Sequence, residues 1–451
     1  MKKKMVLIGC GSAMFTKGLV MDLIKHPAGF QWELALCDID RVVLESMEKL
    51  VKKMITAKGA DIKIAVSDDR KELLPGADYV VCTISVGKRV AREQDVFIPR
   101  KYGIYQPVGD TVMPGGFSRA MRMVPAMLDI VKDCLRFCPN ARFINYANPM
   151  AIICRAIMKT TSYPVTGLCT GTPDSMWYMA DTAGIPRNEA TARAVGLNHL
   201  TFIYKLMHNG EDAKPKLLDV LKQQYDLSAI DKTATDPVIA GRSGKTPGEP
   251  FAWSFFLKYG AFPAPGDRHI TEFFAERFPG GKYYGKTLGV DAYSFEGSIA
   301  GGDRIHNETM VIANDPAPLT EDFFSNIGGE HEQLMEIIDS YEHDYCRIYF
   351  ANLPNRGAVP NLPYDSVLEM PCIATAQGMR PMQTLDFPDH LAAIIQKNLA
   401  IIEVAVDAAV KGDVRLFEEA ILMGGYITDA AVVKSMVAEL IQAQKKYLPQ
   451  F

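Results

Sequence analysis

The sequence has little that points to a nucleic-acid-binding, membrane or secreted protein. Its 49 Lys and Arg residues are outnumbered by 53 Asp and Glu residues, and the net charge of −4 offers no basic surface for a nucleic acid or an anionic membrane. The apolar run after Lys2, Lys3 and Lys4 is short and ends in glycines, which is typical of neither a signal peptide nor a membrane-spanning helix. We therefore expect a cytoplasmic protein with no nucleic-acid or membrane partner.

Paired cysteines and repeats are also missing. The chain has nine cysteines, an odd number, and no Cys-x-x-Cys pair occurs among them. Scattered cysteines of this kind argue against a disulfide framework. The sequence shows no internal repeat and no low-complexity segment, so a repeat architecture is not expected either.

What is present is a long chain of ordinary globular composition. With 451 residues, of which 48% are hydrophobic and 23% charged, it is too long for one core and predicts two or three domains. In its first third, apolar strands alternate with helical or loop segments, which predicts an α/β fold with a doubly wound parallel sheet of Rossmann type. A long loop is expected over Val86–Pro114, and two long helices, Phe387–Val410 and Val414–Leu440, close the chain. After the first strand, the expected strands are Glu33–Cys37, Ile62–Val66, Asp78–Ser85, Ala141–Tyr146 and Val165–Leu168.

The amino-terminal stretch predicts a dinucleotide site. Met5–Gly9 is expected to be a buried strand, from which Gly9, Gly11 and Ser12 lead through a tight turn into a helix. Glycine lets the backbone approach a phosphate closely, and the helix amino terminus attracts negative charge. The fingerprint is incomplete, because Met14 stands where a third glycine is usual. Asp38 follows the next strand, where a carboxylate accepts ribose hydroxyls and repels a 2′-phosphate, so we expect NAD rather than NADP.

Four further residues are candidates for chemistry. Cys169 and His199 each follow a predicted strand, and a thiolate with an imidazole suits a divalent transition metal while leaving coordination positions open. Asp110 and Asp267 lie in Gly- and Pro-rich loops and are candidate acid and base. From the residues alone, the alternatives stay open: a lone Cys or His is commonly a core residue, and aspartates in such loops are commonly turn or cap residues.

Several motifs, in order along nearly the whole chain, resemble glycoside hydrolase family 4. These motifs are Gly9-Cys-Gly-Ser12, Ile98-Pro-Arg-Lys-Tyr102-Gly, Gly109-Asp110-Thr111 before Pro114-Gly-Gly116, Asn145-Tyr-Ala-Asn148-Pro149, Gly167-Leu-Cys169, Gly196-Leu-Asn198-His199 and Asn361-Leu-Pro363. The resemblance implies the fold of lactate and malate dehydrogenases, with an NAD-binding Rossmann domain over residues 1–195 and an α+β substrate, metal and oligomerisation domain over 196–451. It also implies bound NAD and Mn²⁺ or another divalent metal ion, and assembly into a homodimer or homotetramer.

The same resemblance implies a glycosidase mechanism outside the usual two-carboxylate scheme. NAD⁺ would take hydride from C3 of the sugar, which acidifies the proton on C2. A base would remove that proton, the leaving group would depart from C1 by elimination, and water would add before the hydride returned to C3. A metal ion would bind the C2 and C3 oxygens and stabilise the enolate charge.

Site roles also follow from the resemblance. Cys169 and His199 match the metal-ligand positions, and Asn148 and Asn198 match substrate-binding positions. Asp110 lies in a segment like that of the α-glycosidases of the family and is the first choice for acid or base. Asp267 is the other catalytic carboxylate, and the sequence does not decide which of the two is acid and which is base. Tyr259 is the candidate base if Asp267 is not one.

The substrate is only partly specified. Thr170, after the metal-type cysteine, replaces the aspartate that would mark the phospho-α-glucosidase subgroup. Lys88, Arg89 and Arg92 would pair with an anionic substituent of the sugar such as a uronate, with Arg89 as the substrate-binding residue, or alternatively would be solvated or bind NAD phosphate. We expect an α-glycosidase for a small galactoside, glucoside or hexuronide.

Three alternatives remain at this stage. The first is a 6-phospho-glycosidase of the same family. The second is an NAD-dependent dehydrogenase of the 2-hydroxyacid type, for which the metal-type pair Cys169 and His199 is out of place. The third is a catalytically inactive sugar or NAD sensor, which the intact set of candidate site residues argues against.

Overall fold

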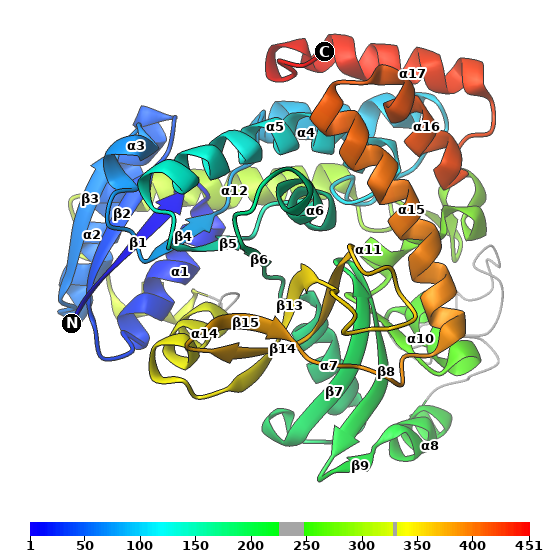
Figure 1. The fold of residues 1–451 in the computed structure, drawn as a ribbon, viewed down its shortest axis with the longest axis horizontal. Coiled ribbons are helices and arrows are strands. Elements are labelled where there is room, and N and C mark those ends of the chain that lie inside the picture. Colours follow the sequence, from blue (N-terminus) through cyan, green and yellow to red (C-terminus); the bar gives the residue numbers. More distant parts are fainter. Residues whose placement is uncertain (225–247, 328–331) are drawn as a thin grey trace.

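The computed structural model describes residues 1–224, 248–327 and 332–451. A 13-stranded mixed sheet crosses the molecule, and helices cover it, as Figure 1 shows. This arrangement confirms the expected α/β class. Within the described residues, no helix is long and apolar enough to span a membrane.

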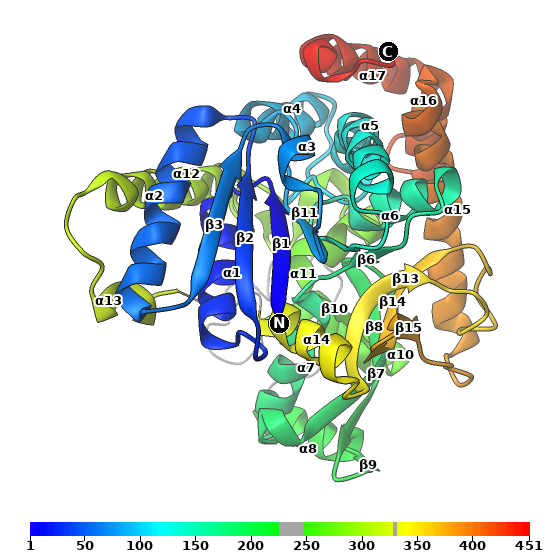
Figure 2. The same cartoon turned by 60° about the vertical axis from the view of Figure 1, so that its left-hand side comes forward.

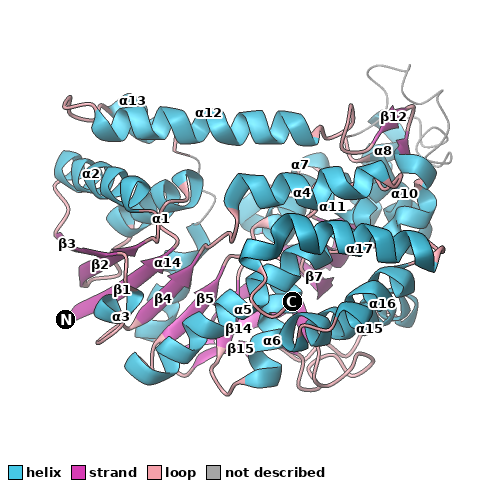
Figure 3. Ribbon diagram, turned by 90° about the horizontal axis from the view of Figure 1, so that it is seen from above, coloured by secondary structure: helices cyan, strands magenta, loops and turns pink. Residues whose placement is uncertain are grey.

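Six parallel strands form the amino-terminal part of the sheet, in the order β6-β5-β4-β1-β2-β3. Helices separate these strands in the sequence, because neighbouring parallel strands need crossover connections. Helices α1 (Ala13–Lys25) and α2 (Arg41–Lys58) cover one face, with α12 (Phe295–Asn314) packed across them, and α3 (Arg70–Leu73), α5 (Met113–Phe137) and α6 (Met150–Thr160) cover the other (Figure 3). The strands are β1 (Lys2–Ile8), β2 (Gln31–Cys37), β3 (Ile62–Ser67), β4 (Tyr79–Cys82), β5 (Arg142–Asn145) and β6 (Val165–Gly167).

The sheet continues beyond β6 with antiparallel strands, in the order β13-β14-β7-β8-β10. The junction is a single pairing of Gly167 on β6 with Asn352 on β13. Figure 2 shows these strands below the parallel part. The division into domains at residue 195 stays a prediction. The strands are β7 (Ala190–Leu197), β8 (Leu200–His208), β10 (Phe262–Ala264), β13 (Arg347–Pro354) and β14 (Val367–Thr375), with β9 (Glu211–Asp212) on β8 and β15 (Gly378–Pro381) on β14.

Two sequence-based expectations about helices are wrong. The loop expected over Val86–Pro114 contains helix α4 (Lys88–Lys101). The buried face of α4 includes the charged residue Asp95, which interrupts the apolar pattern, and Pro99, which is unfavourable inside a helix. The sequence therefore did not indicate this helix. The long final helix is two helices, α16 (Val414–Gly424) and α17 (Ala430–Gln444), because Gly425 ends α16 with a φ of +71°. The preceding helix, α15 (Asp389–Lys411), forms as expected.

Candidate active site

The candidate site lies where the parallel strands end and the antiparallel strands begin. Asn148 follows β5, Cys169 follows β6, and His199 lies in the turn between β7 and β8. Asp110 comes from the segment between α4 and α5, and His269 from the short helix α11 (Asp267–Ile270). The carboxyl ends of parallel strands are the usual ligand-binding edge of such a sheet, so the fold brings these residues together where a ligand would bind.

Asp110, His199 and His269 form a compact cluster. One ligand atom of each lies within 4.8 Å of the others, and the two imidazole rings are 4.2 Å apart between centroids. Nδ1 of His269 is buried and has no hydrogen-bond partner among the described residues. A carboxylate and two imidazoles suit a divalent transition metal, so the donor set fits the expected ion.

The hydroxyl of Thr111 determines which ring nitrogen of His199 carries the proton. Its hydroxyl donates to Asp110 Oδ1 at 2.7 Å and lies 2.6 Å from His199 Nδ1. Because the one hydroxyl proton goes to Asp110, the hydroxyl accepts from Nδ1–H, and Nε2 of His199 is left with its lone pair. This tautomer is the one in which His199 can bind a metal ion.

The backbone of His199 is held in an unusual conformation. Leu197 pairs with Leu200, so Asn198 and His199 are the two residues of a tight hairpin loop, and His199 has a φ of +69°. A non-glycine residue in this region costs about 1 kcal/mol or more, and such costs occur preferentially at functional sites.

The charge of Asp110 is set by opposing effects. Burial disfavours its ionised form, but His199, His269 and Arg119 together hold the pKa of the Asp110 carboxyl well below its usual range. Asn148 Nδ2 also donates to Asp110 Oδ2 at 3.3 Å. At neutral pH, Asp110 is therefore an ionised carboxylate.

Cys169 lies at this edge but is not one of the three clustered groups. Its Sγ accepts a hydrogen bond from the backbone N–H of Gly171 at 3.4 Å. Burial, with Glu369 nearby, raises the pKa of the Cys169 thiol to about 12, so without a cation the group is protonated. Its role as a metal ligand stays a prediction.

Glu369, which sequence reasoning missed, holds three polar side chains in place near the site through hydrogen bonds. It is buried, and it accepts hydrogen bonds from Asn198 Nδ2 at 3.1 Å, from Asn352 Nδ2 at 3.0 Å and from the hydroxyl of Thr172. Oδ1 of Asn198 is left buried without a partner among the described residues. That unpaired acceptor suits a substrate hydroxyl, the role expected for Asn198.

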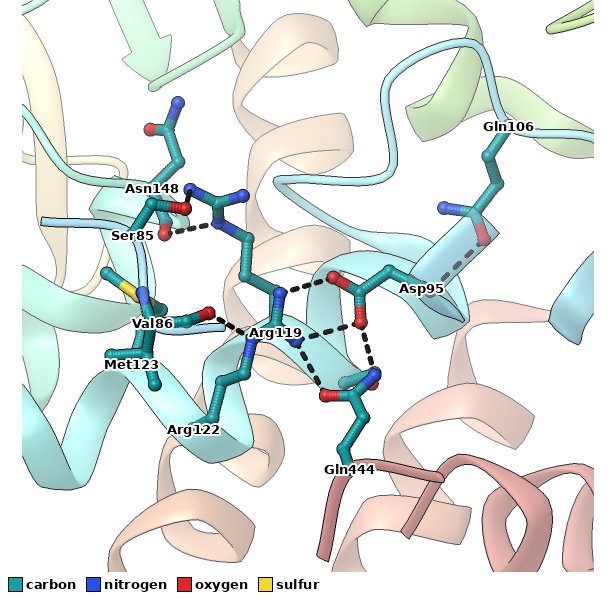
Figure 4. A network of polar contacts seen from close by, with 11 residues as sticks. Ser85, Val86, Asp95, Gln106, Arg119, Arg122, Met123, Asn148 and Gln444 are labelled. Atoms are coloured by element: carbon teal, nitrogen blue, oxygen red, sulfur yellow. Dashed lines mark hydrogen bonds and ion pairs between the residues drawn. The ribbon is translucent and has the colours of Figure 1, made fainter. Parts of the chain in front are cut away.

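A buried polar network holds the backbone of Asn148 in place (Figure 4). Arg119 Nε donates to the Asn148 carbonyl at 2.9 Å. The next turn of α5 holds Arg122, which pairs with Asp95 in an ion pair fully hidden from solvent and also donates to the Val86 carbonyl at 2.8 Å. Gln444, from α17 at the other end of the chain, donates to Asp95 at 2.8 Å and completes the network.

Asp267 lies outside the cluster. Its two oxygens accept hydrogen bonds from the backbone N–H groups of Phe251 and Ala252, each at 2.8 Å, and from the Tyr283 hydroxyl at 2.6 Å. It thereby anchors the start of α10 (Pro250–Tyr259). Burial, with Glu249 nearby, raises the pKa of the Asp267 carboxyl to about 8. Its catalytic role stays a prediction, as does that of Tyr259, whose hydroxyl accepts a hydrogen bond from Arg277.

The glycine turn after β1 has the shape of a phosphate cradle. Gly9 has a φ of +90°, and a Cβ on Gly11 would lie 2.6 Å from Asp38 Oδ2, which accepts a hydrogen bond from the Gly11 N–H at 2.8 Å. No side chain caps the first turn of α1 at Ser12. Open helix N–H groups beside a turn that excludes side chains fit the pyrophosphate of a dinucleotide.

Lys88, Arg89 and Arg92, the basic cluster expected after β4, have different partners in the structure. Lys88 pairs with Asp40 at 2.7 Å, and Arg89 pairs with Glu93 at 3.0 Å and also with Asp303. Arg92 has no carboxylate partner among the described residues, and its guanidinium lies over the Phe295 ring at 5.4 Å. Arg89, the predicted substrate-binding residue, is therefore already paired with two carboxylates, whereas Arg92 is paired with none among the described residues.

Comparison with known proteins places the chain in context. Residues 4–184 match the model for the Family 4 glycosyl hydrolase, and residues 194–424 match the model for its C-terminal domain. An α-galactosidase of Rhizobium meliloti is 27% identical over 99% of this chain and 89% of its own length. An α-galacturonidase of Thermoanaerobacterium saccharolyticum is 26% identical over 98% of this chain and 95% of its own.

Solved structures show the same fold. A 6-phospho-α-glucosidase from gut microorganisms, solved with NAD and Mn²⁺, superposes with a TM-score of 0.83 at 18% identity and covers both chains completely. A malate dehydrogenase of Plasmodium falciparum has a TM-score of 0.52 at 14% identity over 92% of this chain and 99% of its own. The expected dehydrogenase-like architecture is thus confirmed.

Proposed function

The chain belongs to family 4 of the glycosyl hydrolases, and we propose that it hydrolyses an α-glycosidic bond with NAD and a divalent metal ion bound at the site described above. The observation that carries this proposal is the cluster of Asp110, His199 and His269, which lies at the same sheet edge as Asn148 and Cys169. The relatives act, by name, on α-galactosides and α-galacturonides, which is the substrate range we propose here.

Both cofactors fit the residues present. Gly9, Gly11, Ser12 and Asp38 would hold NAD, which supplies reversible hydride transfer at C3 of the sugar. His199 and Cys169, with His269, would hold Mn²⁺ or another divalent ion, which supplies electrostatic stabilisation of negative charge on the sugar oxygens. His269 adds a ligand candidate that was not expected.

The chain's own residues would then divide the proton transfers. Asp110 is ionised at neutral pH and held by Asn148 and Thr111, so we assign it the role of acceptor for the C2 proton. Asp267, whose pKa is raised, is the candidate proton donor to the leaving group. This assignment uses the opposite environments of the two carboxyl groups, which the sequence alone does not show.

A panel of p-nitrophenyl glycosides tests the proposal. We expect α-glycosides to be cleaved only when NAD⁺, Mn²⁺ and a reductant are all present, with no net accumulation of NADH. Steady NADH formation would instead indicate a dehydrogenase, and tight NAD binding without cleavage of any glycoside would indicate a sensor. Assembly as a homodimer or homotetramer and location in the cytoplasm stay predictions.

A further inference from the structure

Glu369 is a buried acidic residue that forms no ion pair with any described residue. It lies on β14 and is only 2% exposed, and its hydrogen bonds come from the neutral side chains of Asn198, Asn352 and Thr172. A buried carboxylate without a cation is costly, even when hydrogen bonds satisfy its oxygens. Its presence here therefore points to a role for the carboxylate itself.

The register of the strands places Glu369 beside the candidate site. One row of paired residues crosses the junction of the parallel and antiparallel parts of the sheet. Its members are Gly167 on β6, Asn352 on β13, Glu369 on β14 and Gly196 on β7. Residues paired in this way share a face of the sheet. Two residues beyond the glycines of this row come Cys169 and Asn198, so Glu369 lies directly behind the edge that carries the site.

The carboxylate of Glu369 fixes the orientation of two amide groups. Its Oε2 accepts hydrogen bonds from Nδ2 of Asn198 at 3.1 Å and from Nδ2 of Asn352 at 3.0 Å. A carboxylate offers only acceptors, so each amide must turn its NH₂ group toward it and its oxygen away. The Oδ1 atoms of both asparagines are buried and have no partner within the described ranges.

Asn198 connects Glu369 with the site. Its side chain also forms a hydrogen bond with the Cys169 thiol, which partly offsets the rise in the pKa of Cys169 that burial and Glu369 cause. Asn198 directly precedes His199 in the tight hairpin loop. Glu369 and Cys169 together engage the NH₂ group of Asn198, and Oδ1 is left to accept a hydrogen bond from a ligand.

We propose that Glu369 is a positioning residue that holds the Asn198 amide so that its Oδ1 accepts a hydrogen bond from one hydroxyl of the sugar. A hydroxyl beside a cation turns its oxygen toward the charge and its proton away, so it needs an acceptor rather than a second donor. An amide that was free to turn over would present NH₂ to that hydroxyl for part of the time. The inference rests on the proposed function, because it assigns how the sugar of that site is held.

Three variants separate this role from packing. Glu369→Gln keeps the size of the side chain, but its amide can donate to Oδ1 of Asn198, so the asparagine can turn over. Asn198→Asp places a second carboxylate against Glu369. The double variant E369Q/N198D restores the match, because the introduced amide donates to the introduced carboxylate, whose other oxygen again faces the sugar.

Sugar binding is the primary measurement. Calorimetry gives the Kd of galactose and of galacturonate for the NAD⁺- and Mn²⁺-loaded protein, and their p-nitrophenyl α-glycosides give KM and kcat. We expect each single variant to raise Kd and KM for the preferred sugar by about 10- to 100-fold, the range for a mispaired buried polar group, and the double variant to recover most of this loss.

Monodeoxy forms of the preferred sugar give a second readout, which a purely structural role would not change. Removal of one particular hydroxyl should weaken binding to the wild type and to the double variant. The same removal should make little further difference to Glu369→Gln, in which the amide no longer selects that hydroxyl.

Thr172→Val is the matched control. It removes the third hydrogen bond to the same carboxylate, at Oε1, and leaves both amide contacts in place. We therefore expect a lower melting temperature for this variant without a change in the hydroxyl that is recognised. Thermal unfolding and NAD⁺ affinity verify that all variants fold.

The outcomes separate this inference from the proposed function. Cofactor-dependent cleavage with equal losses in the single and double variants, or with unchanged sugar binding in Glu369→Gln, would refute the positioning role and leave the proposed function standing. If no glycoside is cleaved but a sugar binds with the expected loss and recovery, the positioning role stands and the proposed reaction fails. If neither sugar binds to the wild type and no glycoside is cleaved, both are refuted.

Discussion

The hydroxyl of Thr111 lies 2.6 Å from Nδ1 of His199 and links it to Asp110. This single contact selects the tautomer in which Nε2 of His199 can bind a cation. Thr111, next to the predicted catalytic residue Asp110, thus determines which ring nitrogen of His199 carries the proton, although His199 lies 88 residues further along the chain. Several measurable consequences follow from this and neighbouring contacts.

Replacing Thr111 should weaken metal binding without removing a ligand. Thr111→Val keeps the shape but loses the hydroxyl, so His199 is no longer held in one tautomer, and we expect Mn²⁺ affinity to fall by about 10- to 100-fold. Titration of Mn²⁺ monitored by electron paramagnetic resonance measures this. Thr111→Ser retains the hydroxyl and is the control. Equal Mn²⁺ affinity in Thr111→Val and wild type would contradict the role of the contact.

Oxidation should inactivate the enzyme through Cys169. If Cys169 binds the metal ion as a thiolate, peroxide converts it to a sulfenic acid and releases the ion. We expect peroxide to abolish activity and to release Mn²⁺ from the loaded protein. Cys346→Ser removes the exposed cysteine and should leave this sensitivity unchanged. Full activity after peroxide treatment, with Mn²⁺ and NAD present, would exclude Cys169 as a ligand.

The glycine turn should tolerate no side chain. A methyl group on Gly11 would lie 2.6 Å from Asp38 Oδ2, at the point where the backbone must approach the dinucleotide. Gly11→Ala should therefore raise the Kd for NAD by about tenfold or more, as fluorescence quenching would report. Gly301→Ala, in α12, meets nothing within 4 Å and should bind NAD like the wild type.

Glu272 should make the fold less stable as the pH rises. Burial raises the pKa of the Glu272 carboxyl to about 8, although the N–H groups of Val108 and Gly109 donate to it. The folded chain then retains a proton that the unfolded chain has lost, so the free energy of unfolding falls between about pH 4 and pH 8. Urea unfolding should show a shallower fall for Glu272→Gln, which has no proton to lose. Parallel pH profiles for the two proteins would contradict this.

The sequence predicted the positions of the parallel strands because each contains a short apolar run. It also predicted that Asn148 and Cys169 follow two of those strands, while His199 follows β7 of the antiparallel part. Residues outside that pattern were harder to place. His269 belongs to the same segment as Asp267, but only the folded chain shows which of the two side chains reaches the cluster.

Long-range pairing explains the other differences. Arg89 differs from Arg92 in having Glu93 four residues further along the chain, where Arg92 has Val96, and Asp303 on α12 adds a partner for Arg89 that the sequence does not show. Asp95 made the buried face of α4 look polar in the sequence. It can be buried because Arg122 and Gln444 pair with it, and these partners lie 27 and 349 residues away along the chain. A single sequence does not contain the information that such partners meet.

The most direct test of the proposed mechanism is hydrolysis in D₂O with NAD⁺ and Mn²⁺, followed by nuclear magnetic resonance of the released sugar. If Asp110 accepts the C2 proton, that proton exchanges with solvent, and the product carries deuterium at C2. Asp110→Asn should then lose both turnover and deuterium incorporation. Release of sugar without deuterium at C2 would show ordinary hydrolysis and contradict the mechanism proposed for this site.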